Sequence, residues 1–200
     1  MTKVKICGIS RLSDVEALNI AKPDYAGFIF AKSPRQVDFE TAMKLRESLD
    51  KDILTVGVFV DEAIETVVEY AKSGVVDVIQ LHGSEKEEYI KKVKDLTGKK
   101  VIKAVAVTSV GDVEKWKNSC ADYILFDNKI PGSGETLDWN VIKGFDRSFF
   151  LAGGLSIENI NEAIEQTRPY AVDVNSGVET SGVKDFDKII AIVENVRYGK

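Results

Sequence analysis

Two side chains that can transfer protons, Cys7 and Asp127, stand at the ends of short apolar runs that are far apart in the chain. A thiolate can remove a proton as a general base and a carboxylic acid can deliver one, so the pair suits acid–base catalysis. We expect Lys5 or the backbone of the first loop to stabilise the thiolate. Each residue also has a structural alternative, because free cysteine is often a buried core residue and Asp127 can cap the loop Asn128–Pro131.

Three further side chains could take part in chemistry. Lys5 and Lys103 are predicted on the inward faces of their strands, where a lysine can form a Schiff base with a carbonyl substrate. The favoured interpretation is an ion pair with an inward acid such as Asp173, because a buried lysine needs a partner. His82 can serve as an acid or base, or can be a loop residue bonded to the backbone, and we assign it a binding or structural role.

Two glycine-containing segments and one arginine are suited to binding anions. Gly153 and Gly154 allow the backbone to approach a ligand, and the helix predicted after them presents N-terminal amides that attract phosphate. The segment Asn175, Ser176 and Gly177 can offer further backbone donors. Arg35, in AKSPRQV, is a fork-shaped donor that matches a carboxylate, with a solvated loop charge as the alternative. Glycine occurs in turns at least as often as at ligand sites, so one glycine pair is weak evidence for a binding site. Two such segments at adjacent strand ends are moderately specific evidence.

Eight alternating strand and helix patterns position these residues. We predict strands at Val4–Cys7, Tyr25–Phe30, Leu54–Val60, Val76–Leu81, Val101–Val105, Tyr123–Phe126, Phe149–Ala152 and Ala171–Val174. The clearest helices are predicted at Ser13–Ile20, Phe39–Leu49, Ala63–Ser73, Glu85–Leu96, Ile157–Gln166 and Phe186–Val196, with weaker ones near Val113–Lys117 and Asn140–Ile142.

The repeated pattern predicts a compact (β/α)8 TIM barrel with short loops, formed by residues 1–200 as a single catalytic domain. An open doubly wound sheet is the alternative, but it usually carries a glycine-rich turn after its first strand, whereas the glycines here follow strands six, seven and eight. Barrels often bind phosphate at the loops after strands seven and eight. Because side chains alternate along a strand, Cys7, Asp127 and the pair Gln80 and His82 are expected to converge on the C-terminal mouth.

Composition limits the classes of function. The chain has 32 acidic and 27 basic residues and a formal net charge of −5, which argues against broad nucleic-acid binding. We expect no membrane span, because no apolar run reaches the roughly 18 residues that a span requires, and we expect a cytoplasmic protein with free thiols at Cys7 and Cys120. A single histidine and no clustered ligand pattern predict no metal site.

Seven motifs, in order along the chain, resemble the phosphoribosylanthranilate isomerase family over essentially the whole sequence. They are KICGI, GFIF followed by KSPRQV, VGVFV, QLHG, FDNKIPGSGETLDW, LAGGL and DVNSGVE. The resemblance implies an Amadori rearrangement without a cofactor, in which N-(5'-phosphoribosyl)anthranilate becomes 1-(o-carboxyphenylamino)-1-deoxyribulose 5-phosphate in tryptophan biosynthesis.

The same resemblance implies a role for each matching residue. Asp127 matches the general acid that opens the furanose ring, and Cys7 matches the general base that removes the C2' proton. Arg35 matches the residue that holds the anthranilate carboxylate. The resemblance further implies phosphate binding by amides around Gly154 and around Ser176 and Gly177, and a mobile cover formed by Gly132, Ser133 and Gly134.

Two rival functions remain open. The related aminoaldose isomerase of histidine biosynthesis uses aspartates at the ends of both strand one and strand six, whereas strand one ends here in Cys7. A non-catalytic phosphosugar-binding barrel would keep the phosphate loops and tolerate the loss of Cys7 or Asp127. The expected partner is a phosphorylated small molecule, and the chain is expected to be a monomer or a homodimer.

Overall fold

Eight parallel strands close into a barrel in the computed structural model, which describes residues 1–128 and 137–199. Each strand pairs with the next one along the chain, and β8 pairs with β1, so the ring is closed and an open sheet is excluded. The strands are β1 (Lys3–Cys7), β2 (Tyr25–Ile29), β3 (Leu54–Phe59), β4 (Val78–Leu81), β5 (Lys100–Ala106), β6 (Tyr123–Asp127), β7 (Phe149–Leu151) and β8 (Ala171–Val174). The predicted TIM barrel is confirmed.

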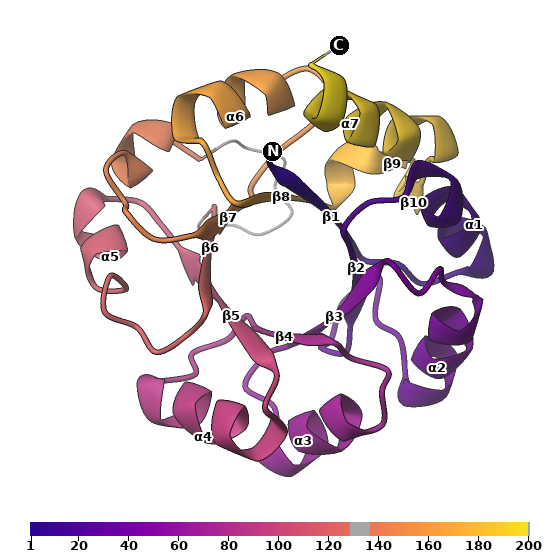
Figure 1. The fold of residues 1–200 in the computed structure, drawn as a ribbon, viewed down its shortest axis with the longest axis horizontal. Helices are drawn as coiled ribbons and strands as arrows, with labels where there is room; N and C mark the ends of the chain where they lie inside the picture. Colours follow the sequence, from indigo (N-terminus) through magenta and orange to yellow (C-terminus); the bar gives the residue numbers. More distant parts are fainter. Residues whose placement is uncertain (129–136, 200) are drawn as a thin grey trace.

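Helices form an outer ring around the strands (Figure 1). They are α1 (Leu12–Ala21), α2 (Phe39–Ser48), α3 (Ile64–Lys72), α4 (Glu87–Thr97), α5 (Val110–Glu114), α6 (Ile160–Thr167) and α7 (Phe186–Tyr198), with the 3₁₀ turns η1 (Trp139–Ile142) and η2 (Ser176–Val178). Side-chain caps fix several starts: Asp38 accepts a hydrogen bond from the Thr41 amide, and Asp185 accepts one from the Lys188 amide. The predicted helix at Ile157 begins three residues later, because residues 157–159 form a turn.

Inward side chains fill the barrel in layers, as in other closed barrels. The apolar side chains that fill the barrel interior are those of Tyr25, Val56, Val78, Ile102, Ala104, Leu125, Phe150, Ala152 and Ala171. Lys5 is fully buried in this interior, and its Nζ lies 2.7 Å from Asp173 Oδ2. The predicted pairing of Lys5 with an inward acid is therefore confirmed. The burial of Lys5 needs no Schiff base to explain it.

Lys103 does not point into the barrel, so this prediction is wrong. Ile102 and Ala104 are the inward residues of β5, and Lys103 therefore faces the helices. Its Nζ lies 2.9 Å from Glu85 Oε2 and donates to the Gly83 carbonyl at 2.6 Å. Both faces of β5 are apolar, so the sequence pattern does not show which face is inward.

A small hairpin after β8 was not predicted. Its strands β9 (Glu179–Thr180) and β10 (Val183–Lys184) pair antiparallel and lie beside the start of α1 (Figure 1). Two-residue strands are too short to produce a recognisable alternation of apolar and polar residues. The hairpin brings two charged residues, Glu179 and Lys184, to the C-terminal mouth.

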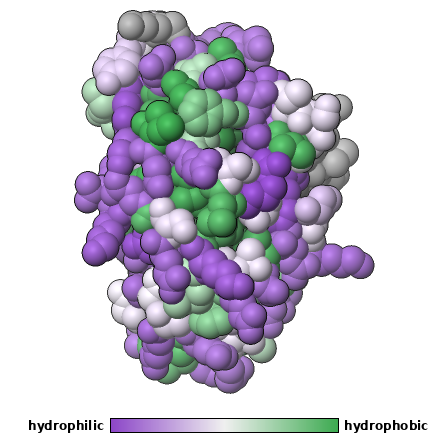
Figure 2. All heavy atoms as spheres, turned by 90° about the vertical axis from the view of Figure 1, so that its right-hand side faces the viewer, coloured by the Kyte–Doolittle hydropathy of each residue, from purple (hydrophilic) through white to green (hydrophobic). Residues whose placement is uncertain are grey.

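The side of the molecule formed by α1 and α2 is mainly hydrophilic, with apolar residues between the charged ones (Figure 2). Scattered exposed apolar side chains such as Leu12 and Ile20 are normal on a protein surface. Within residues 1–128 and 137–199, no helix has both the length and the apolar character needed to cross a membrane.

Candidate active site

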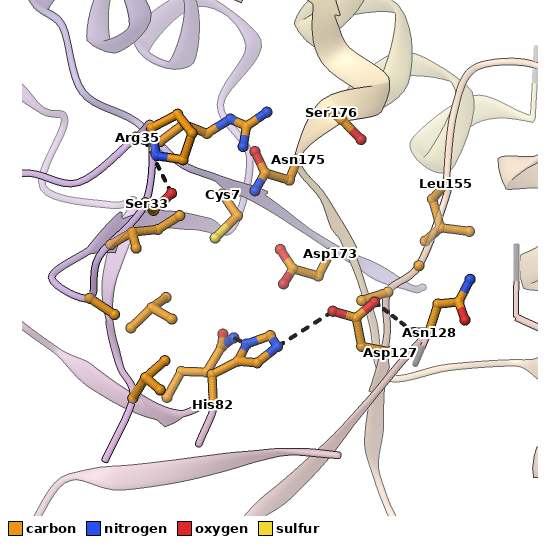
Figure 3. Close-up of a pocket in the computed structure, with 18 of the residues that line it drawn as sticks. Cys7, Ser33, Arg35, His82, Asp127, Asn128, Leu155, Asp173, Asn175 and Ser176 are labelled. Carbon is orange, nitrogen blue, oxygen red and sulfur yellow. Dashed lines mark hydrogen bonds and ion pairs between the residues drawn. The ribbon is translucent and has the colours of Figure 1, made fainter. Parts of the chain in front are cut away.

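A cavity of about 350 Å³ opens at the C-terminal ends of the strands. Barrel enzymes keep their active sites at this end. Its lining residues come from the ends of seven of the eight strands, all except β5. They include most of the predicted site residues: Cys7, Arg35, His82, Asp127, Gly153, Gly154, Asn175 and Ser176. Figure 3 shows Cys7 and Asp127 facing this one cavity from different sides.

Cys7 ends β1 and is 5% exposed, with its thiol toward the cavity. Burial raises the pKa of the thiol, because a thiolate is poorly solvated there, and the neighbouring Lys5 ammonium opposes this rise. The Asp173 carboxylate raises the thiol pKa further. Lys5 lies two residues before Cys7 on the same face of β1, as the alternation predicts, and it opposes the rise in the thiol pKa more strongly than Lys184, which acts in the same direction.

Asp127 ends β6 and interacts with the histidine that follows β4. Asp127 Oδ2 lies 3.5 Å from His82 Nε2, and Asp127 Oδ1 accepts a hydrogen bond from the Asn128 amide at 2.8 Å. Residues 129–131 of the loop that Asp127 was expected to cap lie outside the described residues, so the capping alternative stays a prediction, whereas Asp127 does line the cavity. One oxygen accepts from the Asn128 amide while the other faces His82 (Figure 3).

Gln80 sets the orientation of His82. Gln80 Nε2 lies 2.9 Å from His82 Nδ1, and Gln80 is 1% exposed. With the amide nitrogen as donor, Nδ1 accepts and the ring proton lies on Nε2, toward Asp127. Within the described part of the chain, the buried Gln80 Oε1 has no hydrogen-bond partner. Gln80 lines the cavity, and an unpaired buried acceptor at a cavity wall is suited to a donor group on a ligand.

The two glycine segments lie side by side at the ends of β7 and β8. Among the described residues, the backbone amides of Gly154 and Ser176 have no protein acceptor, and both residues line the cavity. Free amides at adjacent loops form a site for an anion. Gly177 does not line the cavity, because it packs against the β7 loop, where an added Cβ would lie 1.9 Å from the Leu155 carbonyl oxygen.

Arg35 reaches the cavity from the loop after β2, but it is not a solvated loop charge. Its guanidinium makes two hydrogen bonds of 2.5 Å to the carboxylate of Glu179. This ion pair spans 144 residues of sequence and was not anticipated, because only the fold brings the β9–β10 hairpin beside the loop after β2.

Some candidate residues remain without a structural test. Gly132, Ser133 and Gly134 lie outside the described residues, so the predicted cover stays a prediction. Within residues 1–128 and 137–199, no group of three or more His, Cys, Asp or Glu side chains is arranged to hold a metal ion. Cys7 and Cys120 are free thiols.

Comparison with known proteins agrees with this architecture. Residues 4–195 match the family model described as N-(5'phosphoribosyl)anthranilate (PRA) isomerase. The chain belongs to the phosphoribosylanthranilate isomerase family. A relative named N-(5'-phosphoribosyl)anthranilate isomerase, from Endomicrobium trichonymphae, is 47% identical over 201 residues, which cover 98% of this chain and 99% of the relative.

Solved structures of phosphoribosylanthranilate isomerases have the same fold. One, in complex with reduced 1-(o-carboxyphenylamino)-1-deoxyribulose 5-phosphate, is 37% identical with a TM-score of 0.88, and the match covers 98% of this chain and 99% of that one. Another, of mutually generated monomers of the dimeric enzyme from Thermotoga maritima, is 38% identical with a TM-score of 0.87 and the same coverage. That relative is a dimeric enzyme of which monomers were generated.

Proposed function

We propose that this chain is an isomerase that converts N-(5'-phosphoribosyl)anthranilate into 1-(o-carboxyphenylamino)-1-deoxyribulose 5-phosphate in tryptophan biosynthesis, with residues 1–200 as one catalytic domain. The observation that carries the proposal is the presence of a thiol and a carboxyl group, Cys7 and Asp127, on different sides of one cavity. Family membership and the product analogue bound to a relative support the same substrate class. The expected cytoplasmic location stays a prediction.

The proposed reaction begins with proton transfer from Asp127 to the ring oxygen of the ribose. The C1'–O bond breaks, and the nitrogen lone pair forms a protonated Schiff base. Cys7, as the thiolate, then takes the proton from C2', and the electron pair of that C–H bond moves toward the iminium to give an enolamine. Tautomerisation of the enolamine to the ketone, with a proton added at C1', completes the rearrangement without any redox cofactor.

The surroundings of the two groups fit these roles. His82 beside Asp127 is positioned to hydrogen-bond the carboxyl group through Nε2, and Gln80 fixes the histidine ring. Lys5 beneath Cys7 favours the thiolate at the moment that it must accept a proton. General acid–base catalysis of this kind typically contributes roughly 10²–10⁴ to a rate.

Binding groups at the cavity match the two ends of the substrate. We assign the phosphate to the backbone amides of Gly154 and Ser176, with Gly153, Asn175 and Gly177 shaping the two loops. We assign the anthranilate carboxylate to Arg35, whose guanidinium lines the same cavity.

The test is the fluorescence-monitored consumption of N-(5'-phosphoribosyl)anthranilate by the purified chain. We expect turnover by the wild type, and none by Cys7→Ala or Asp127→Asn, both with an unchanged circular-dichroism spectrum. Cys120→Ser is the matched thiol control, since Cys120 lies away from the cavity and bonds to the Glu87 carbonyl. Wild-type rates in Cys7→Ala or Asp127→Asn would overturn the assigned roles.

The same preparations test the two rival functions. Turnover of only the aminoaldose of histidine biosynthesis would replace the proposed substrate. Calorimetric binding of the product analogue without any turnover would favour a non-catalytic phosphosugar-binding barrel.

A further inference from the structure

Two cations hold one buried carboxylate at the rim of the cavity. Glu179, the first residue of β9, has a side chain only 6% exposed, and it accepts hydrogen bonds from both Arg35 and Lys184. Lys184, the last residue of β10, is 3% exposed, and its Nζ lies 2.7 Å from Glu179 Oε1. Lys184 also donates to the backbone and side-chain oxygens of Asn175, each at 2.8 Å. The hairpin therefore joins the loops after β2 and β8.

The geometry leaves part of the Arg35 guanidinium available. Its Nε and Nη2 each donate to a different oxygen of Glu179. A guanidinium has five N–H donors, so the Nη1 group and the second proton of Nη2 remain for another acceptor. Within the described residues these donors have no protein acceptor, and Arg35 lines the cavity. One edge of the fork is fixed by the protein, and the donors of the other edge remain for a ligand in the cavity that Arg35 lines.

The arginine stem is also held in place. Gly8, in the loop after β1, has a φ of +77°, and a Cβ added there would lie 2.6 Å from Arg35 Cδ and 2.8 Å from Asn175 Oδ1. Arg35 therefore passes directly against the backbone of the first loop. Fixing a long, flexible side chain before the ligand arrives reduces the entropy that binding must overcome.

Lys184 keeps this cluster positively charged. A carboxylate paired with an arginine alone would cancel its charge and weaken its attraction for an anion. Here Glu179 is shared between two cations, so the cluster retains a net positive charge. Burial lowers the pKa of Lys184, and the hydrogen bond and charge of Glu179, 2.7 Å away, oppose that fall. Burial by itself would raise the pKa of Glu179, but the hydrogen bonds from Arg35 and Lys184 outweigh it and hold that pKa below its usual value. Glu179 is thus ionised at neutral pH.

We propose that Glu179 is a positioning residue for Arg35, and that the Glu179–Lys184 pair makes Arg35 a rigid, still cationic receptor for an aryl carboxylate. The inference rests on the proposed function, since it concerns the carboxylate of the proposed substrate. It assigns the β9–β10 hairpin a part in substrate specificity.

The test compares Glu179→Gln with the wild type on two ligands. The ligands are the reduced product analogue with its ortho-carboxylate and the same compound without it, and calorimetry gives the Kd of each. An amide of the same shape cannot accept both N–H groups of the fork, so we expect at least a tenfold weaker Kd for the carboxylated ligand. The ligand without a carboxylate should bind both proteins equally. In kinetics, KM should rise while kcat stays within about threefold.

Two controls separate positioning from a structural effect. Glu162→Gln makes the same chemical change on the exposed face of α6 and should alter neither ligand's Kd. In an Arg35→Ala background, Glu179→Gln should add little, because a residue that acts through Arg35 has no effect once Arg35 is gone. If Glu179→Gln does not fold, Glu179→Asp retracts the carboxylate from Arg35 and should show the same selective loss.

The outcomes are distinct. Equal weakening of both ligands, or no weakening of either, overturns the inference. Additive effects of the Arg35 and Glu179 substitutions overturn it as well. Absence of turnover by the wild type would instead remove the proposed function, and the calorimetric comparison would still decide whether Glu179 positions Arg35.

Discussion

Replacing Lys5 by Met removes the cation beneath Cys7 and separates two effects of the same side chain. Lys5 is fully buried and pairs with Asp173 at 2.7 Å. Removing one partner of a buried pair leaves an uncompensated charge and typically costs roughly 3–5 kcal/mol. At about 2–4 °C per kcal/mol for a domain of this size, Tm should fall by roughly 6–20 °C. Calorimetry measures this loss.

The second effect is on the thiol. The electrostatic effect of Lys5 on Cys7 is larger than that of Asp173, so the pKa of Cys7 should rise even if Asp173 takes up a proton. A rise of one unit corresponds to about 1.4 kcal/mol and reduces the thiolate at neutral pH about tenfold. The rate of alkylation by iodoacetamide, measured against pH in a Cys120→Ser background, should therefore fall about tenfold at pH 7.

Lys103→Met is the matched control. Lys103 is a second buried lysine, paired with Glu85 at 2.9 Å, but it faces the helices rather than the barrel interior. We expect a comparable loss of Tm and an unchanged alkylation profile of Cys7. The reasoning is refuted if Lys5→Met leaves that profile where it was, or if Lys103→Met shifts it equally.

Three further outcomes follow from the site. Because burial raises the pKa of Cys7, its alkylation by iodoacetamide in a Cys120→Ser background should still accelerate as the pH rises from 7 to 9, and a rate that is already constant above pH 7 would contradict the raised pKa. Gln80→Met should lower kcat about tenfold by releasing the His82 ring, while Tm stays equal or rises because a buried unpaired oxygen is removed; a lower Tm with full activity would contradict this. Gly177→Ala should lower Tm by several degrees, since its Cβ would overlap the Leu155 carbonyl, and an unchanged melting curve would contradict that packing.

The alternation of side chains along each strand predicted more of the site than any other pattern in the sequence. Alternation along KVKIC placed Lys5 and Cys7 on one face, and in the structure both are inward, with Cys7 at the mouth. The same argument placed Asp127 and Gln80 correctly. These predictions succeeded because β1, β4 and β6 each carry a polar residue that marks the inward face near the C-terminal end. The C-terminal ends of parallel strands also meet at one side of a barrel, which brings these residues together.

The same alternation argument assigned the wrong face to Lys103 in β5. The run KVIKAVA has apolar residues on both faces, because the barrel interior and the helix layer are both dry. The sequence pattern predicted that Lys103 points into the barrel. In the register of β5 with β4 it points toward the helices, where its Nζ donates to Glu85 and to the Gly83 carbonyl.

What the sequence determined by itself was the local and periodic part of the protein: the eight strand–helix units, the face on which Cys7 lies and the glycine loops at the ends of β7 and β8. Only the tertiary structure decided that Arg35 is held by Glu179 and Lys184, that Gln80 orients His82, and that Gly177 packs instead of lining the cavity. Periodicity is a property of neighbouring residues and can be seen in one segment. An ion pair across 144 residues depends on barrel closure, which no segment contains.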